Sequence, residues 1–199
     1  MHTHLASQKL GNILQKRVFF SDGLEQQQGT IEEAYLHPTR GELLGFIIKP
    51  ENKTAPLLLA INQLLLLKPV NTESQLAALS HIISLVEELG DGVMPYQEFL
   101  TAEVITEDGQ YCGCIAEVYF CQEGLRTIYQ LKTPGLRGLF SKPQFVEGSH
   151  SDFYSRRYHR LILAAGAPRF ASLTEAVEGL QQTALAFVGD DYAGKNFQR

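Results

Sequence analysis

The sequence is poor in cysteine and carries no excess of basic residues, and each shortage excludes a class of protein. The three cysteines, Cys112, Cys114 and Cys121, are too few and too closely spaced for the disulfide framework of a small secreted domain. Their odd number fits a reducing compartment. The formal net charge of −5 argues against a protein dominated by nucleic-acid binding, although it leaves room for a local basic patch.

The sequence also lacks a long uninterrupted apolar run. Its most apolar stretch, residues 55–70, contains Asn62 and Gln63 and is bounded by Pro56 and Pro69. That stretch is too short and too interrupted to span a bilayer, so we expect buried strands joined by a turn. The first 17 residues show neither the apolar region nor the cleavage site of a signal peptide. We therefore expect a cytoplasmic protein, with peripheral attachment to a membrane complex left open.

One short sequence motif occurs twice in the chain. "VFFSDG" at 18–23 and "VITEDG" at 104–109 are both apolar, β-prone and closed by Asp-Gly, a common hairpin turn. The sequences that follow match as well, at Gly29 and Gly113, Ile31 and Ile115, Glu33 and Glu117, Tyr35 and Tyr119, Gly41 and Gly124, and Lys49 and Lys132. The repeat predicts that the chain contains two copies of one unit, in which three strands are joined by two turns.

A helical pattern follows each β unit. In 71–92, apolar residues recur at spacings of three and four, from Leu76 to Leu89. The second pattern opens with a Ser172-x-x-Glu175 capping box and carries an apolar stripe through Phe187. The order of elements is therefore predicted to be β unit, helix, β unit, helix.

The repeated pattern of an acidic-Gly turn, a second Gly and "I-x-E-V/A-Y" resembles the PRC-barrel family, over roughly 11–70 and 97–167. This small β-barrel occurs in the photosynthetic reaction-centre H subunit and in the ribosome maturation factor RimM. The resemblance implies a mainly β protein with helices (α+β), built as two PRC-like barrels in tandem. The expected divisions are an N-terminal barrel at 1–70, a linking helix at 71–92, a C-terminal barrel at 93–168, and a helix with a polar tail at 169–199.

The resemblance implies a function in binding, since the family pattern carries no catalytic residues. Duplicated soluble barrels are most similar to proteins of photosynthetic bacteria, particularly cyanobacteria. We expect a non-enzymatic scaffold or assembly factor that binds a subunit of a photosynthetic complex at the thylakoid or inner membrane surface. Two alternatives stay open: a ribosome-assembly factor of the 16S rRNA processing type that binds a ribosomal protein, and a pigment-binding or chaperone protein of the light-harvesting apparatus.

The residues themselves favour no catalytic, cofactor or metal site. Cys112 and Cys114 lie two apart in a predicted strand, on one face, with no nearby histidine to complete a tetrahedral zinc site. Glu33 and Glu117 occupy equivalent repeat positions and are expected to face solvent, which does not favour paired acid–base chemistry.

The second unit differs from the first by a longer segment at 132–168, which brings basic and aromatic residues into an acidic protein. That composition is enriched at protein interfaces. The predicted partner-binding residues are Arg137, Phe140, Lys142, Phe145, Tyr154, Arg156, Arg157 and Tyr158. The partner can be an acidic protein face, an anionic lipid surface or RNA, of which RNA is the weakest option. An ordinary strand with Phe153 and Leu161 in the core and solvated arginines is the alternative interpretation.

Overall fold

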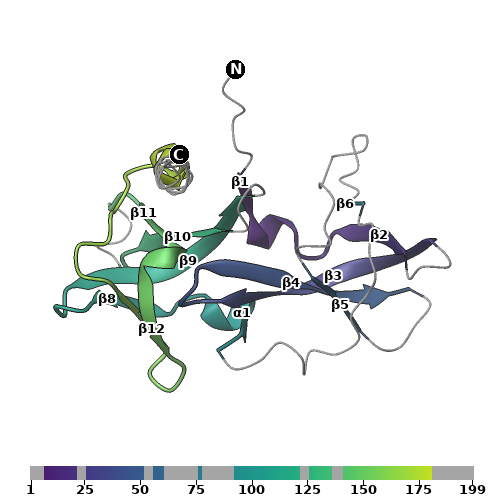
Figure 1. Ribbon diagram of the computed structural model, residues 1–199, viewed down its shortest axis with the longest axis horizontal. Coiled ribbons are helices and arrows are strands. Elements are labelled where there is room, and N and C mark those ends of the chain that lie inside the picture. The colour runs from purple at the N-terminus through teal and green to yellow at the C-terminus, as the bar shows by residue number, and fades with distance from the viewer. Residues whose placement is uncertain are drawn as a thin grey trace, which may run out of the picture.

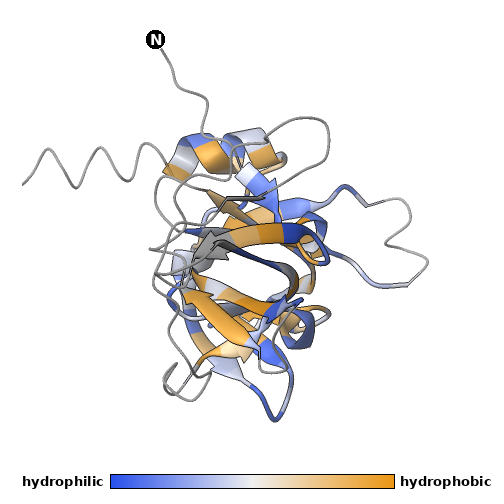
Figure 2. Cartoon of the chain, turned by 90° about the vertical axis from the view of Figure 1, so that its right-hand side faces the viewer, coloured by the Kyte–Doolittle hydropathy of each residue, from blue (hydrophilic) through white to orange (hydrophobic). Residues whose placement is uncertain are grey.

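The protein is mainly β, with two sheets that lie next to each other in the computed structural model (Figure 1). The structure describes residues 7–21, 26–51, 56–60, 76–77, 92–121, 126–135 and 141–180. Hydrophobic residues concentrate on the strands, whereas the turn that projects furthest at the bottom of the view is hydrophilic (Figure 2).

The first sheet has the strand order β5-β4-β3-β2-β6, and β7 pairs with β3 beside this path. Its strands are β2 (Arg17–Ser21), β3 (Gln26–His37), β4 (Glu42–Pro50), β5 (Leu57–Ala60), β6 (Leu76–Ala77) and β7 (Met94–Pro95).

The second sheet has the order β11-β10-β9-β8-β13-β12, and β1 pairs with β9 beside this path. Its strands are β1 (Ser7–Lys9), β8 (Glu103–Thr106), β9 (Tyr111–Cys121), β10 (Thr127–Lys132), β11 (Gln144–Glu147), β12 (Ser151–Ser155) and β13 (Arg160–Leu163). Short helical elements are η1 (Leu10–Asn12), α1 (Tyr96–Phe99) and η5 (Gly148–His150), and residues 173–180 form a further helix.

The strand registers confirm the internal repeat. Val18 pairs with Gly29 in the first sheet, as Val104 pairs with Gly113 in the second. The matched lysines also agree, because Lys49 pairs with Thr30 and Lys132 pairs with Cys114, its repeat equivalent. The structural repeat also includes strands that the sequence matches did not reveal. Strand β6 runs parallel to β2 as β13 runs parallel to β8, and β5 lies against β4 as β11 lies against β10.

The same β-bulge occurs in both units. The register shifts between Ile31 and Glu33 in β3, and the equivalent shift in the second unit passes from Ile115 to Glu117. In each bulge the glutamate carboxylate accepts a hydrogen bond from the next backbone N–H, at 2.9 Å from Ala34 and 3.0 Å from Val118. A bulge leaves one residue out of the ladder, and these carboxylates satisfy the donor that it frees.

The two units exchange their leading segments. Strand β1, which precedes the first unit, pairs with β9 of the second, and β7, which precedes the second unit, pairs with β3 of the first. Lys9 lies opposite Tyr119, and Pro95 lies opposite the equivalent Tyr35. After each leading segment the chain reverses direction and enters its own unit. The residue at this reversal has φ +66° in both units and is Gln15 in the first and Thr101 in the second. The two units are therefore interlocked and not merely consecutive.

Both units contribute to one hydrophobic core. Equivalent positions of both units are buried in it, and these include Leu10 and Tyr96, Ile13 and Phe99, Val18 and Val104, Ile31 and Ile115, Phe46 and Tyr129, and Leu59 and Val146. A smaller cluster forms where the helix at 173–180 packs its apolar stripe on β9, β10 and β11. Half of the predicted capping box is present at its start: Ser172 Oγ accepts from the Glu175 N–H at 3.2 Å, whereas the Glu175 carboxylate accepts from the Ala171 N–H at 3.0 Å.

Two expectations are not confirmed by the described strands. The strands form open sheets, so the closure of each unit into a barrel stays a prediction. Within the helix expected at 71–92, Leu76–Ala77 form strand β6 and residue 92 lies in a turn, while the rest lies outside the described residues. The apolar spacing there did not distinguish a short strand from a helix. No helix in the described part of the chain is long and apolar enough to cross a membrane.

Candidate protein-binding surface

The predicted binding residues do not form one surface. Lys142 and Phe145 lie at the β11 edge of the second sheet, whereas Tyr154, Arg156, Arg157 and Tyr158 lie on the β12–β13 hairpin at the opposite edge. Three strands, β10, β9 and β8, separate β11 from this hairpin in the strand order. Arg137 and Phe140 fall outside the described residues.

Phe145 belongs to the protein interior. Its ring is buried in the small core cluster with Val177 and Leu180, and lies 6.1 Å from the ring of Tyr119. Backbone hydrogen bonds of 3.0 and 2.9 Å to Phe170 also cover this edge of the sheet. The aromatic residue that sequence composition assigned to an interface therefore holds the C-terminal helix on the sheet.

Residues 151–163 form a two-stranded hairpin and not the single strand of the alternative interpretation. His159 turns the chain at φ +48°, in the left-handed region that histidine visits more readily than most residues. Its Nε2 donates to the carbonyl oxygen of Leu100 at 3.0 Å, so its Nδ1 accepts from the Tyr154 hydroxyl, also at 3.0 Å. Tyr154 packs edge-on against Phe99, at 5.5 Å between ring centroids. The base of the hairpin is thus fixed to the core.

Arg156 fastens the hairpin to α1. Its guanidinium makes a bidentate contact with Glu98, with Nε donating to Oε1 at 2.6 Å and Nη2 donating to Oε2 at 3.0 Å. The hydrogen bond from Arg156 holds the pKa of the Glu98 carboxyl below its ordinary value. Arg156, which was predicted to bind a partner, is therefore engaged within the molecule.

The tip of the hairpin presents two predicted residues to solvent. Tyr158 is 65% exposed, and the guanidinium carbon of Arg157 lies 5.5 Å from its ring centroid. This is a cation–π distance, so the two side chains support each other. We call Arg157 and Tyr158 the hairpin tip; the turn that follows β12 projects at the lower edge of Figure 1.

The sheet beside the hairpin has an exposed apolar row that sequence reasoning missed. Phe153 on β12 pairs with Ile162 on β13, Ile162 with Ile105 on β8, and Ile105 with Tyr111 on β9. Residues paired across strands share a face of the sheet. Phe153 is 55% and Tyr111 46% exposed, and the two isoleucines are half-buried. Phe153 is thus a surface residue and not part of the core.

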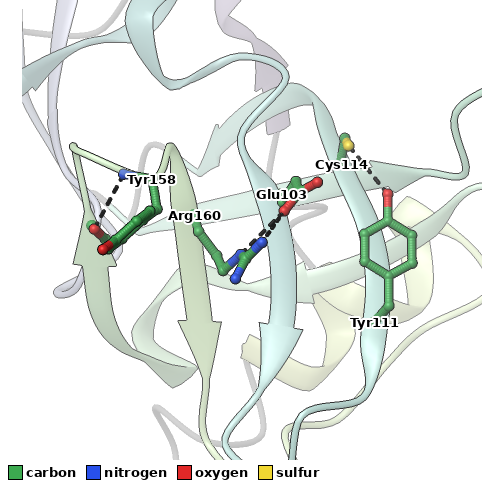
Figure 3. Close-up of polar contacts among 6 residues, drawn as sticks. Glu103, Tyr111, Cys114, Tyr158 and Arg160 are labelled. Atoms are coloured by element: carbon green, nitrogen blue, oxygen red, sulfur yellow. Dashed lines mark hydrogen bonds and ion pairs between the residues drawn. The ribbon is translucent and has the colours of Figure 1, made fainter.

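A polar row lies beside the apolar one on the same face. Ser155, Arg160, Glu103 and Cys114 pair in that order across the four strands. Figure 3 shows Arg160 directed at Glu103 and the Tyr111 hydroxyl directed at Cys114. The nearest Arg160–Glu103 contact is 2.5 Å, and the Tyr111 oxygen lies 3.3 Å from Cys114 Sγ. Burial, together with this hydrogen bond, raises the pKa of Tyr111 to about 12. We call the two rows the outer face.

The sequence contained a signal for the outer face that was not used. In "EVIT" and "RLIL", apolar residues occupy both alternating sets of positions, although antiparallel sheets commonly have one face in water. The expectation that both cysteines share a face was wrong, because the β-bulge at Cys112 shifts the alternation of side chains along β9. Cys112 packs against the main core, while Cys114 lies on the outer face.

The strongest cluster of ionisable groups lies between the exchanged segments. Contrary to expectation, Glu117 is buried: its carboxylate accepts from the Tyr96 hydroxyl and the Val118 N–H, and its Oε2 lies 2.8 Å from Lys9 Nζ. Burial and the bond to Glu117 raise the pKa of Tyr96. The donors come from β1, α1 and β9, so this cluster joins the two units. Glu33, the repeat equivalent of Glu117, is half-buried, and burial raises its pKa.

A second buried carboxylate is similarly engaged. Glu147 Oε1 accepts from Arg126 Nη1 at 2.9 Å and from Ser149 Oγ at 2.6 Å. Within the described residues, no group of three or more histidine, cysteine, aspartate or glutamate side chains is arranged to hold a metal ion.

In comparisons with known proteins, the chain matches no family model and no curated protein is significantly similar to it.

Proposed function

We propose that this protein is a non-enzymatic scaffold or assembly factor that binds a protein partner through the hairpin tip. The observation that supports this proposal is the exposure of Tyr158 beside Arg157 on a turn whose base is rigid. Tyrosine and arginine are enriched among residues that dominate binding energy. The contacts of His159 and Arg156 order the hairpin before binding, which reduces the entropy that association costs.

The polar interior supports a structural role for the buried acids. Glu117 and Glu147 each have hydrogen-bond donors from elements that are distant in sequence, and those contacts join parts of the fold. In the proposal these groups stabilise the protein, and none performs acid–base chemistry.

The resemblance to the PRC-barrel family supplies the proposed location. The partner is a subunit of a photosynthetic complex, and the protein associates peripherally with the thylakoid or inner membrane surface. We also propose that each repeat is a variant of the PRC-like barrel unit. The matched registers and matched bulges of the two units support a duplication, whatever the degree of barrel closure.

The test is to extract the tagged protein gently from its own host and separate the extract on a density gradient. We expect it to migrate with a membrane pigment–protein complex, and the Arg157→Glu/Tyr158→Ala variant to lose that association while keeping its circular dichroism spectrum. Arg40→Glu, on a turn of the first sheet, is the control that should keep it. Migration with ribosomal particles would replace the proposal with a ribosome-assembly role, and free migration of the wild type would refute it.

A further inference from the structure

The outer face is self-complementary. Its apolar row reads Phe153, Ile162, Ile105 and Tyr111 across β12, β13, β8 and β9, which is aromatic, aliphatic, aliphatic, aromatic from either end. The centre of the polar row is a cation and an anion, Arg160 and Glu103, on the same two central strands. Both rows are therefore centred between β13 and β8.

This symmetry has a geometric consequence. Consider a second copy turned by 180° about an axis that lies above the sheet, parallel to the strands and midway between β13 and β8. Strand β13 then faces β8 of the other copy, and β12 faces its β9. Ile162 meets Ile105, Phe153 meets Tyr111, and Arg160 meets Glu103, and each contact occurs twice. A twofold interface requires such a surface, in which the same patch complements itself.

We propose that the outer face is the interface of a homodimer, with a second copy of this chain stacked on it as a two-sheet sandwich. Sheets that stack face to face lie about 10 Å apart, with their side chains interdigitated. The exposed phenylalanine and tyrosine supply apolar area, and the charges of the two copies sum to zero at the centre.

The proposal uses residues different from those of the hairpin tip. Arg157 and Tyr158 lie on the turn beyond the ends of β12 and β13, outside both rows. A dimer formed through the outer face therefore carries two hairpin tips, and partner binding can be tested separately from dimer formation. The contact extends over only four strands, so its dissociation constant should be on the order of micromolar.

Charge exchange gives a specific test. Arg160→Glu leaves two acidic side chains on the face, and Glu103→Arg leaves two basic ones, so each variant repels its own copy. The two variants complement each other when mixed, because the two acidic side chains of one copy then meet the two basic side chains of the other. The double variant Arg160→Glu/Glu103→Arg restores opposite charges within one chain and should dimerise by itself.

Sedimentation velocity at concentrations on the order of 100 μM measures these outcomes. We expect a wild-type dimer, two monomeric single variants, a heterodimer in their equimolar mixture, and a dimeric double variant. Lys49→Glu, which alters an exposed ion pair with Glu32 at 3.6 Å in the other sheet, is the matched control and should remain dimeric. Arg157→Glu should also remain dimeric.

Three results would overturn the proposal. They are a monomeric wild type at that concentration, single variants that dimerise like the wild type, and a mixture that stays monomeric. Circular dichroism shows whether each variant is folded. Phe153→Asp supplies an independent probe, because its exposed position tolerates a polar residue in the monomer while the dimer requires an apolar one. It should weaken dimerisation at least about tenfold, and unchanged dimerisation would likewise contradict the proposal.

Discussion

Lys9 Nζ lies 2.8 Å from Glu117 Oε2, although the two residues belong to different halves of a duplicated chain. This contact exists because each half sends its leading segment to the sheet of the other. The Tyr96 hydroxyl reaches the same carboxylate from the leading segment of the second half. The buried acid thus receives a donor from both exchanged segments.

The first prediction concerns this carboxylate. Tyr96→Phe removes one donor from a buried charge and should lower the free energy of unfolding by about 1–3 kcal/mol. Urea denaturation measures the loss. Tyr158→Phe removes a hydroxyl from an exposed ring and is the control, with an expected change within about 0.5 kcal/mol. Equal effects of the two substitutions would contradict a stabilising role for the Tyr96–Glu117 contact.

Removal of residues 1–9 tests the exchange itself. Strand β1 pairs with β9 of the second unit, so its loss should lower amide protection in Tyr119–Cys121 by about tenfold or more. The equivalent residues of β3, Tyr35–His37, are covered by β7 and should keep their protection. Hydrogen exchange read by mass spectrometry compares the two segments. Loss confined to β3 would mean that each leading segment pairs within its own unit.

Two glycines allow a matched test of how closely the units approach. Gly41 and Gly109 both have positive φ, but a Cβ at Gly41 would lie 2.2 Å from the carbonyl carbon of Gly148, whereas a Cβ at Gly109 meets nothing within 4 Å. Gly109→Ala should cost about 1 kcal/mol of stability from its backbone conformation alone.

Gly41→Ala should cost at least about 2 kcal/mol more, because the backbone around Gly148 must move. Thermal denaturation of both variants separates the steric contribution from the conformational one. A similar loss of stability in the two variants would show that the Gly41 turn does not pack against η5.

The pH dependence of stability should include a contribution from Glu33. Burial raises its pKa in the folded protein, so the unfolded chain loses this proton first as pH increases. Glu33 therefore lowers the free energy of unfolding as pH rises from about 4.5 through the folded-state pKa. Glu33→Gln should remove that decrease, as measured by urea denaturation across this range. Glu32→Gln, at the neighbouring exposed carboxylate, should keep it, and identical pH profiles for all three proteins would contradict this origin.

The sequence predicted the repeat well because the features that define it are local. The Asp108-Gly109 turn, the glycine that pairs with Val104 and the alternating strands can all be recognised from a few consecutive residues. The extension of the repeat to β6 and β13 was missed, since "LA" and "RLIL" share almost no sequence and only their parallel pairing shows that they correspond.

The exchange of segments could not be predicted in the same way. Pairing between Lys9 and Tyr119 joins residues far apart in the chain, and no local pattern specifies it. The hairpin itself was not predicted. Composition selected Arg157 and Tyr158, which lie at the exposed turn, together with Arg156 and Phe145, whose partners, Glu98 and the C-terminal helix, depend on tertiary packing.

Site-specific photo-crosslinking in the host tests the proposed function most directly. A photoreactive phenylalanine derivative at position 158 should form a covalent adduct with a protein of a membrane pigment–protein complex. The same probe at Lys49, an exposed position in the other sheet, should form none. Adducts with that complex from 158 alone would support the hairpin tip as the binding surface. Absence of an adduct from 158, or equal labelling from both positions, would contradict it.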